Sequence, residues 1–168
     1  MFQNIDSSRI ALLETFREFT ENAVKDLLLP VRVQREGEKT PPRSAAVYLM
    51  ALPDFTSAEK KAPYIIHQLV TAQDKQKPGE QIKAAALVRS VFAVYHEDGQ
   101  EGALSLLGLM ERLRIPLEKS VVIGKRFVLD LEKGPEILIY PDNKPPYYVG
   151  EMITNWQIPA VEREYRHA

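Results

Sequence analysis

Three histidines, His67, His96 and His167, are the side chains of this sequence that titrate nearest to neutral pH. His167 is the penultimate residue, and chain ends are often poorly ordered. His67 lies inside a predicted strand, and no second histidine or carboxylate at a fixed local spacing supports it as a general base. It would act in catalysis only if partners from distant segments assembled around it.

His96 lies in the sequence YHEDGQEG, where Glu97, Asp98 and Glu101 make an acidic neighbourhood. Acidic residues beside a histidine can indicate a metal site, but this spacing matches neither the HExxH motif nor an EF-hand loop. The same residues match a variant of the capping box, in which the side chains of Asp98 and Glu101 each bind the other's amide. The segment is therefore interpreted as a strand end that leads into a capped helix.

The sequence VIGKRF contains the pair Gly124-Lys125, which suggests a phosphate-binding loop. That loop needs a glycine five residues before its Gly-Lys pair and a serine or threonine after it, and Lys119 and Arg126 hold those positions. The GxSxG, CxxC and glycine-rich dinucleotide motifs do not occur either. The sequence therefore predicts no catalytic residue, no cofactor and no metal.

The composition is ordinary for a folded protein, with 45% hydrophobic and 27% charged residues among 168. This length predicts a single domain over residues 1–168. The net charge of −1 and the lack of a basic stripe with interleaved aromatics indicate no sequence-specific nucleic-acid partner. Because the chain has no cysteine, disulfides and thiolate chemistry are excluded, which fits a reducing compartment.

The N-terminal sequence MFQNIDSSRIALLETF has no basic region followed by an unbroken apolar stretch, so it does not predict a secretory signal. No apolar run approaches the roughly 18 residues of a membrane-spanning helix. We therefore expect a protein that stays in the cytoplasm where it is made and has no membrane partner.

The spacing of apolar residues predicts two amphipathic helices. Over residues 8–29 they recur in steps of three and four, and Asp6 or Ser7 can cap the first amides. The second helix begins after Asp98 and stops at Pro116.

β-Branched residues and turn signals, among them Pro78-Gly79, predict the strands. The predicted strands cover residues 45–54, 63–74, 82–97, 120–131, 135–142 and 147–158. The order of elements, with short connections, predicts an α+β fold in which two helices pack on one face of a mainly antiparallel sheet.

The last predicted strand, YYVGEMITNWQI, has two different faces. One face is the better core candidate, with the indole of Trp156 under a helix. It consists of Tyr148, Gly150, Met152, Thr154, Trp156 and Ile158. The other face is half polar and is expected to meet solvent or a neighbouring subunit. It consists of Tyr147, Val149, Glu151, Ile153, Asn155 and Gln157.

Residues 87–164, about half of the chain, resemble small tail-completion proteins of bacterial prophage clusters. The resemblance rests on an acidic "ED" at a strand end, on a helix of the type GxxxLLxLxERIR, and on a closing GEM-T-W-IP pattern. This last pattern is matched by Gly150, Glu151, Met152, Thr154, Trp156, Ile158 and Pro159. The chain thus resembles the tail-terminator or neck proteins of long-tailed phages, and its first half matches them only in the order of elements.

The resemblance implies a tail-terminator-like fold and a structural role without a cofactor or catalytic residue. Such a protein forms a homohexameric ring that caps the tail tube and contacts the tube protein and the head–tail connector. It would occupy the bacterial cytoplasm during assembly and then the virion tail. Two alternatives stay open: a head-closure, tube or baseplate component, and a small cytoplasmic α+β enzyme or ligand-binding domain that uses His67 or His96.

A ring subunit needs two different complementary surfaces. Segments 34–44 and 72–81 are predicted to protrude as charged loops, and a tyrosine-rich stretch lies near the last strand. The candidate interface residues are Tyr140, Tyr147, Tyr148, Glu151, Arg35, Lys39, Arg43, Lys75 and Lys77. The alternatives are that the tyrosines cover the sheet edge of their own subunit and that the loops are solvated tips.

Overall fold

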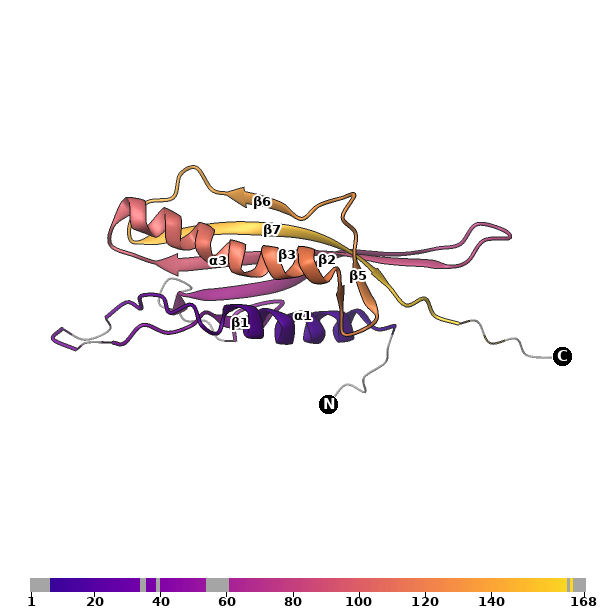
Figure 1. Ribbon diagram of the computed structural model, residues 1–168, viewed down its shortest axis with the longest axis horizontal. Coiled ribbons are helices and arrows are strands. Elements are labelled where there is room, and N and C mark those ends of the chain that lie inside the picture. Colours follow the sequence, from indigo (N-terminus) through magenta and orange to yellow (C-terminus); the bar gives the residue numbers. More distant parts are fainter. Residues whose placement is uncertain (1–6, 34–35, 39, 54–60, 163, 165–168) are drawn as a thin grey trace.

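The computed structural model describes residues 7–33, 36–38, 40–53, 61–162 and 164 of the chain. These residues form two helices and seven strands (Figure 1). In chain order they are α1 (Arg9–Val24), β1 (Ala46–Leu49), β2 (Tyr64–Lys75), β3 (Lys83–Tyr95), α3 (Gly99–Ser120), β4 (Val122–Ile123), β5 (Phe127–Leu129), β6 (Glu136–Ile139) and β7 (Tyr147–Ile158).

The sheet has the strand order β1-β2-β3-β7-β5-β4, and β6 also pairs with β7. Its centre is antiparallel: β3 pairs with β2 on one side and with β7 on the other, from Ala84↔Ile158 to Tyr95↔Tyr147. The β1/β2 pair is parallel, which the longer connection between these strands permits. The predicted α+β class with a mainly antiparallel sheet is therefore confirmed.

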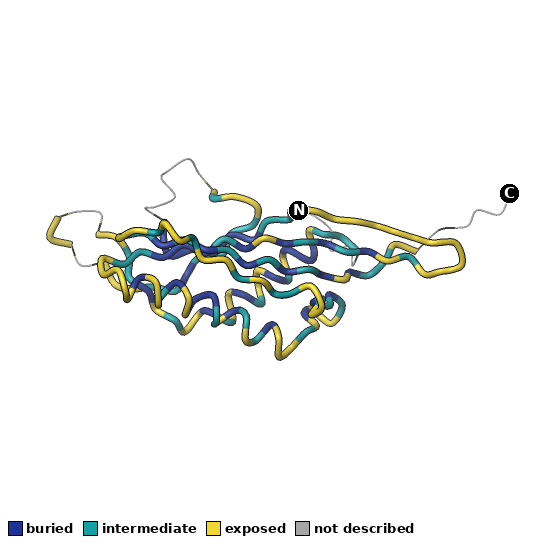
Figure 2. Tube along the Cα trace, turned by 90° about the horizontal axis from the view of Figure 1, so that it is seen from above, coloured by how far each residue is buried: buried dark blue, intermediate teal, exposed yellow. Residues whose placement is uncertain are grey.

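Both helices cover one face of the sheet, as predicted. The helices contact each other, α1 also contacts β1 and β2, and α3 contacts β3 and β7. Buried positions gather where helices and sheet meet, whereas the far end of the β2–β3 hairpin is exposed throughout (Figure 2). We call the sheet face opposite the helices the open face.

The core confirms the predicted faces of β7, whose residues alternate along the strand between buried and partly exposed. The indole of Trp156 is 1% exposed and meets the ring of Phe16 edge-on, with 5.2 Å between the ring centroids. Its Nε1 donates to Thr154 Oγ1 at 2.9 Å, so its polar atom is satisfied inside the core. The indole therefore lies under α1.

The predicted helix ends need correction. Ser8, and not Ser7, caps α1 by accepting from Ile10 N. Asp6, the other predicted cap, lies outside the described residues. The helix ends at Val24 and not at residue 29, since Leu29 lies in a β-bridge, in which its backbone N–H donates to Arg43 O at 2.8 Å.

The second helix does not stop at Pro116 but continues to Ser120. Its apolar stripe runs on through the proline, since Leu113 and Leu117 are both fully buried. The helix ends where Val121, with φ +61°, turns its N–H back to Leu117 O. Packing of this stripe therefore outweighs the hydrogen bond that the proline cannot make.

The predicted strand 120–131 is in fact the hairpin β4–β5. Gly124 and Lys125 have φ of +57° and +63°, so the backbone turns here instead of extending. A Cβ added at Gly124 would lie 2.6 Å from Thr15 Cγ2, so the turn packs closely on α1. The Gly-Lys pair is therefore a tight turn against a helix.

The contact between Gly102 and Tyr148 leads to a prediction about stability. A Cβ added at Gly102 would lie 2.2 Å from Tyr148 Cε2, and Tyr148 is buried. Gly102→Ala should therefore lower the free energy of unfolding by about 1–3 kcal/mol, the usual cost of overpacking. In the same helix, a Cβ at Gly108 would meet open space. Gly108→Ala should therefore raise the free energy of unfolding by about 0.5–1 kcal/mol.

Urea unfolding followed by circular dichroism checks both variants. Equal effects of the two substitutions would contradict the close packing of Tyr148 on this helix.

Candidate functional site

His67 is a buried core residue with both ring nitrogens engaged. Its Nε2 lies 2.8 Å from Thr20 Oγ1, and its Nδ1 lies 2.6 Å from Ser90 Oγ. The imidazole also stacks on Phe16, with 3.9 Å between the ring centroids. Burial lowers its pKa from 6.5 to about 3, so the ring is neutral at physiological pH.

The hydrogen bonds fix the tautomer of His67. Thr20 has one hydroxyl hydrogen, which it donates to Phe16 O at 2.7 Å, so its oxygen must accept from His67 Nε2–H. The unprotonated Nδ1 then accepts from the hydroxyl of Ser90. Neither nitrogen is left for a substrate, and the side chain ties α1 to β2 and β3.

His96 takes part in the cap of α3. Its Nδ1 accepts from the backbone N–H of Asp98 at 3.0 Å, while Asp98 Oδ1 accepts from Glu101 N at 2.9 Å. The predicted N-cap at Asp98 is confirmed, but the reciprocal bond of the capping box is wrong, because the Asp98 amide donates to His96 and not to Glu101. In the described part of the chain, no group of three or more histidine, aspartate or glutamate side chains could hold a metal ion. His167 lies outside the described residues.

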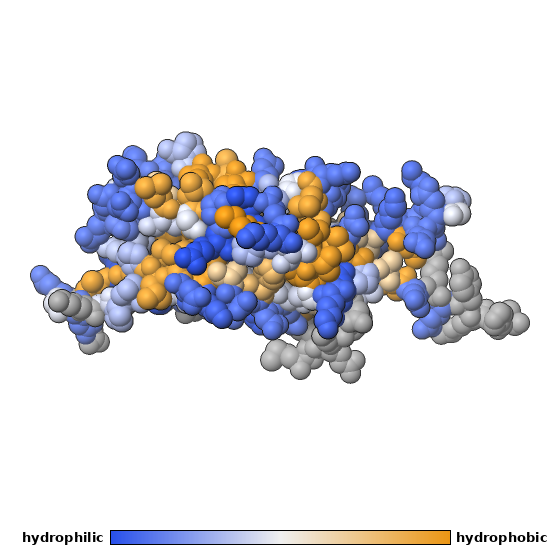
Figure 3. Space-filling model, viewed as in Figure 1, coloured by the Kyte–Doolittle hydropathy of each residue, from blue (hydrophilic) through white to orange (hydrophobic). Residues whose placement is uncertain are grey.

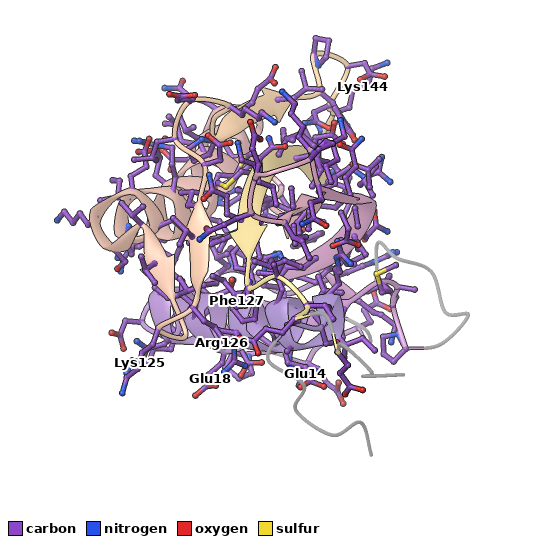
Figure 4. The ribbon with its side chains drawn as sticks, turned by 90° about the vertical axis from the view of Figure 1, so that its right-hand side faces the viewer. Glu14, Glu18, Lys125, Arg126, Phe127 and Lys144 are labelled. Atoms are coloured by element: carbon purple, nitrogen blue, oxygen red, sulfur yellow. The ribbon has the colours of Figure 1, made fainter. Side chains whose placement is uncertain are left out.

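A groove of about 660 Å³ runs between α1 and the β4–β5 turn. Its lining includes Glu18 and Glu21 from the exposed side of the helix and Lys25 directly after it. Figure 4 shows Glu14 and Glu18 on α1 and Lys125 on the turn, all pointing away from the sheet. This groove is therefore a charged surface feature, and neither His67 nor His96 lines it.

The predicted tyrosine group is divided by the structure. Tyr148 is 3% exposed and lies inside the protein, on the helix face of the sheet, so it is not available to a partner. Tyr147 lies on the open face, where its hydroxyl accepts from Arg32 Nη1 at 3.1 Å and its ring packs beside Tyr95. This part of the open face holds a small apolar cluster, to which the chain between β1 and β2 contributes Leu52 and Ala62.

Tyr140 and Glu151 form a pair near β6. The Tyr140 hydroxyl donates to Glu151 Oε2 at 3.1 Å, and burial followed by this hydrogen bond raises the pKa of Tyr140. On the neighbouring strands of the open face, Arg89 Nη2 donates to Gln68 Oε1 at 2.9 Å. These partly exposed polar pairs mark the middle of the open face.

The predicted basic residues have different surroundings. Arg43 donates to Ser44 O and Pro63 O, both at 3.0 Å, so it holds its own segment to the start of β2. Arg35 and Lys39 lie outside the described residues. The described residues of segment 34–44 are mostly exposed.

Lys75 and Lys77 lie on the end of the β2–β3 hairpin. We call residues 70–83 the arm; all of them are exposed except Ile82, which is half-buried. Beyond the Asp74↔Ala84 pair the arm continues outward past the end of β7 (Figure 1), and its turn at Pro78-Gly79 is as predicted. The predicted charged loop 72–81 is thus the outer part of a β-hairpin.

The base of the arm is fixed by one ion pair. Arg9 Nη1 donates to Asp74 Oδ2 and Arg9 Nη2 to Asp74 Oδ1, both at 3.0 Å. Arg9 Nη2 also reaches the backbone oxygen of Gln73 at 3.2 Å. The start of α1 therefore holds the direction in which the arm leaves the sheet.

No family model matches the sequence, and no curated protein matches it. Among the described residues, no helix is both long enough and apolar enough to cross a membrane.

Proposed function

We propose that this chain is a structural assembly subunit of the tail-terminator type. Copies of it form a closed ring, which we propose to be a hexamer. The ring caps the tail tube of a long-tailed phage and joins it to the head connector. The ring assembles in the bacterial cytoplasm and becomes part of the virion tail. The resemblance of residues 87–164 and the α+β architecture, with two helices on one face of the sheet, both support this proposal.

The observation that carries the proposal is the exposed arm. A two-stranded hairpin alone in water is marginally stable at best. Beyond the Asp74↔Ala84 pair no third strand lies beside the hairpin in the described part of the chain, and residues 75–81 are all exposed. Pairing with β7 and the Arg9–Asp74 ion pair hold only the base of the hairpin. An ordered hairpin of this kind gains its full stability when a partner covers it, which is what a subunit of an assembly provides.

The alternative function, that of an enzyme or a ligand-binding domain, would depend on His67 or His96 as its reactive side chain. Both are engaged in their own fold, His67 with Thr20 and Ser90, and His96 with the cap of α3. The same two residues therefore have structural roles that need no substrate.

Negative-stain images of tail tubes test the proposal. The tube protein of the same phage is allowed to polymerise with and without an excess of this chain. We expect added density on one tube end and shorter tubes, because a bound ring stops growth there. Tubes of unchanged length with bare ends would contradict the proposal.

A further inference from the structure

We propose that neighbouring copies join by pairing the free edge of β2 in the arm with the free edge of β6, so that one continuous sheet crosses the subunit boundary. This inference rests on the proposed function, since it names the surfaces through which the ring would close.

The first free edge belongs to β2. β1 pairs with β2 only from Ala46↔Tyr64 to Leu49↔His67. Met50, with φ +69°, then turns the chain away after its N–H has bonded to His67 O. From Val70 to Lys75 the outer edge of β2 pairs with no strand in the described part of the chain. A row of backbone N–H and C=O groups is thereby left for another strand.

The second free edge belongs to β6. This strand pairs with β7 from Glu136↔Ile153 to Ile139↔Gly150, and its other edge pairs with no strand among the residues described. Leu138 is 49% exposed and Ile139 is 37% exposed. Apolar side chains are visible along the margin where β6 lies (Figure 3). An apolar edge strand left open in water tends to pair with another chain.

The two free edges lie on opposite sides of one sheet, because β2 and β6 are separated by β3 and β7. Joining them therefore gives head-to-tail contacts, each between two different surfaces. Adjacent strands of a sheet are rotated relative to one another, so each added subunit turns the next one. A head-to-tail contact with a constant rotation can close into a ring.

The charges of the two segments favour a second copy as the occupant. Residues 130–142, which contain β6, carry Asp130, Glu132, Glu136 and Asp142 against one lysine. The arm carries Lys75, Lys77 and Lys83 against two acidic residues, and one of these, Asp74, is neutralised by Arg9. A basic edge and an acidic edge on the same chain suit each other across a subunit boundary.

Cysteine cross-linking tests the pairing directly, because the natural chain contains no cysteine. Thr71 pairs with Leu87 and Leu138 pairs with Glu151, which puts both side chains on the open face. In a continuous sheet they would lie on the same side of the boundary. Three variants are needed: Thr71→Cys, Leu138→Cys and the double variant, each treated with a short bis-maleimide at high protein concentration and again with tube protein.

The double variant should give a ladder of covalent oligomers that ends at the ring, and each single variant should stay uncross-linked. A double variant of Thr71→Cys with Leu104→Cys is the matched control, since Leu104 is also exposed but lies on α3; it should give no ladder. Dimers from Thr71→Cys alone would mean that two β2 edges pair with each other. Such dimers would overturn the inference. A cross-link to the tube protein in place of the ladder, or the absence of a ladder, would overturn it as well.

A second measurement compares the association constant of Leu138→Lys with that of the natural protein. Leu138 is exposed, so this substitution places a charge on the β6 edge without disturbing the core. We expect about tenfold weaker association or more, and no comparable change for Leu104→Lys. If oligomers form but neither the ladder nor this loss is found, the edge pairing is wrong and the proposed function stands. If the unmodified chain stays monomeric both alone and with tube protein, the proposed function fails as well.

Discussion

Replacing Trp156 by alanine is expected to lower the free energy of unfolding by about 3–5 kcal/mol. The indole is enclosed between β7 and α1, in edge-on contact with Phe16. Removing the indole leaves a cavity where sheet and helix meet. It also removes the hydrogen bond that the hydroxyl of Thr154 accepts from the indole in the natural protein. Both losses act in the same direction.

Urea unfolding followed by circular dichroism measures this effect, since the variant loses the single tryptophan and its fluorescence. Gln157→Ala, at the next position of the same strand, is the matched control because Gln157 is exposed. It should change the free energy by no more than about 0.5 kcal/mol. A loss at Trp156 as small as that of the control would mean that the indole is not part of the core.

The second large effect is a loss of stability in acid caused by His67. Its pKa is about 3 in the folded protein, against the 6.5 of an unperturbed histidine, which is the value expected in the unfolded chain. Between these values the unfolded state binds a proton that the folded state does not, so stability falls as the pH falls. The stability that comes from keeping His67 neutral is complete above pH 6.5. Between pH 6.5 and about pH 3 it decreases by about 1.4 kcal/mol per pH unit.

The comparison with His67→Gln isolates this contribution. Glutamine does not titrate, and its amide can still donate to Thr20 and accept from Ser90. Between about pH 7 and about pH 4.5, the free energy of unfolding should therefore fall by about 2–3 kcal/mol more for the natural protein than for the variant. Carboxylates shared by both proteins cancel in this difference. Equal pH dependence of the two proteins would show that His67 is not held neutral by burial.

The parts of the fold that follow from local pattern could be predicted from sequence. Side chains alternate between the two faces of a strand, and this rule applied to residues 147–158 predicted both the bounds of β7 and its buried face. The spacing of apolar residues gave both helices and the face of the sheet that they cover. Local rules were less successful where packing decided the outcome, as at Pro116, which lies within α3 because the leucines around it are buried.

The candidate surfaces were harder to predict, because a free strand edge depends on where another strand stops. The charges of Lys75 and Lys77 indicated an exposed segment, but only the turn of the chain at Met50 leaves the edge of β2 open. Likewise, nothing in the local sequence of His67 points to Thr20 or Ser90, which come from α1 and β3. Alternation in the last strand already placed Tyr148 on the buried face, apart from Tyr147.

The central claim is that this chain acts by assembling into a ring. Native mass measurement of the purified protein at high concentration, alone and mixed with tube protein, tests it most directly. We expect one closed oligomer of defined copy number, present either in the protein alone or on addition of the tube protein. A protein that remains a monomer in both samples would contradict the claim.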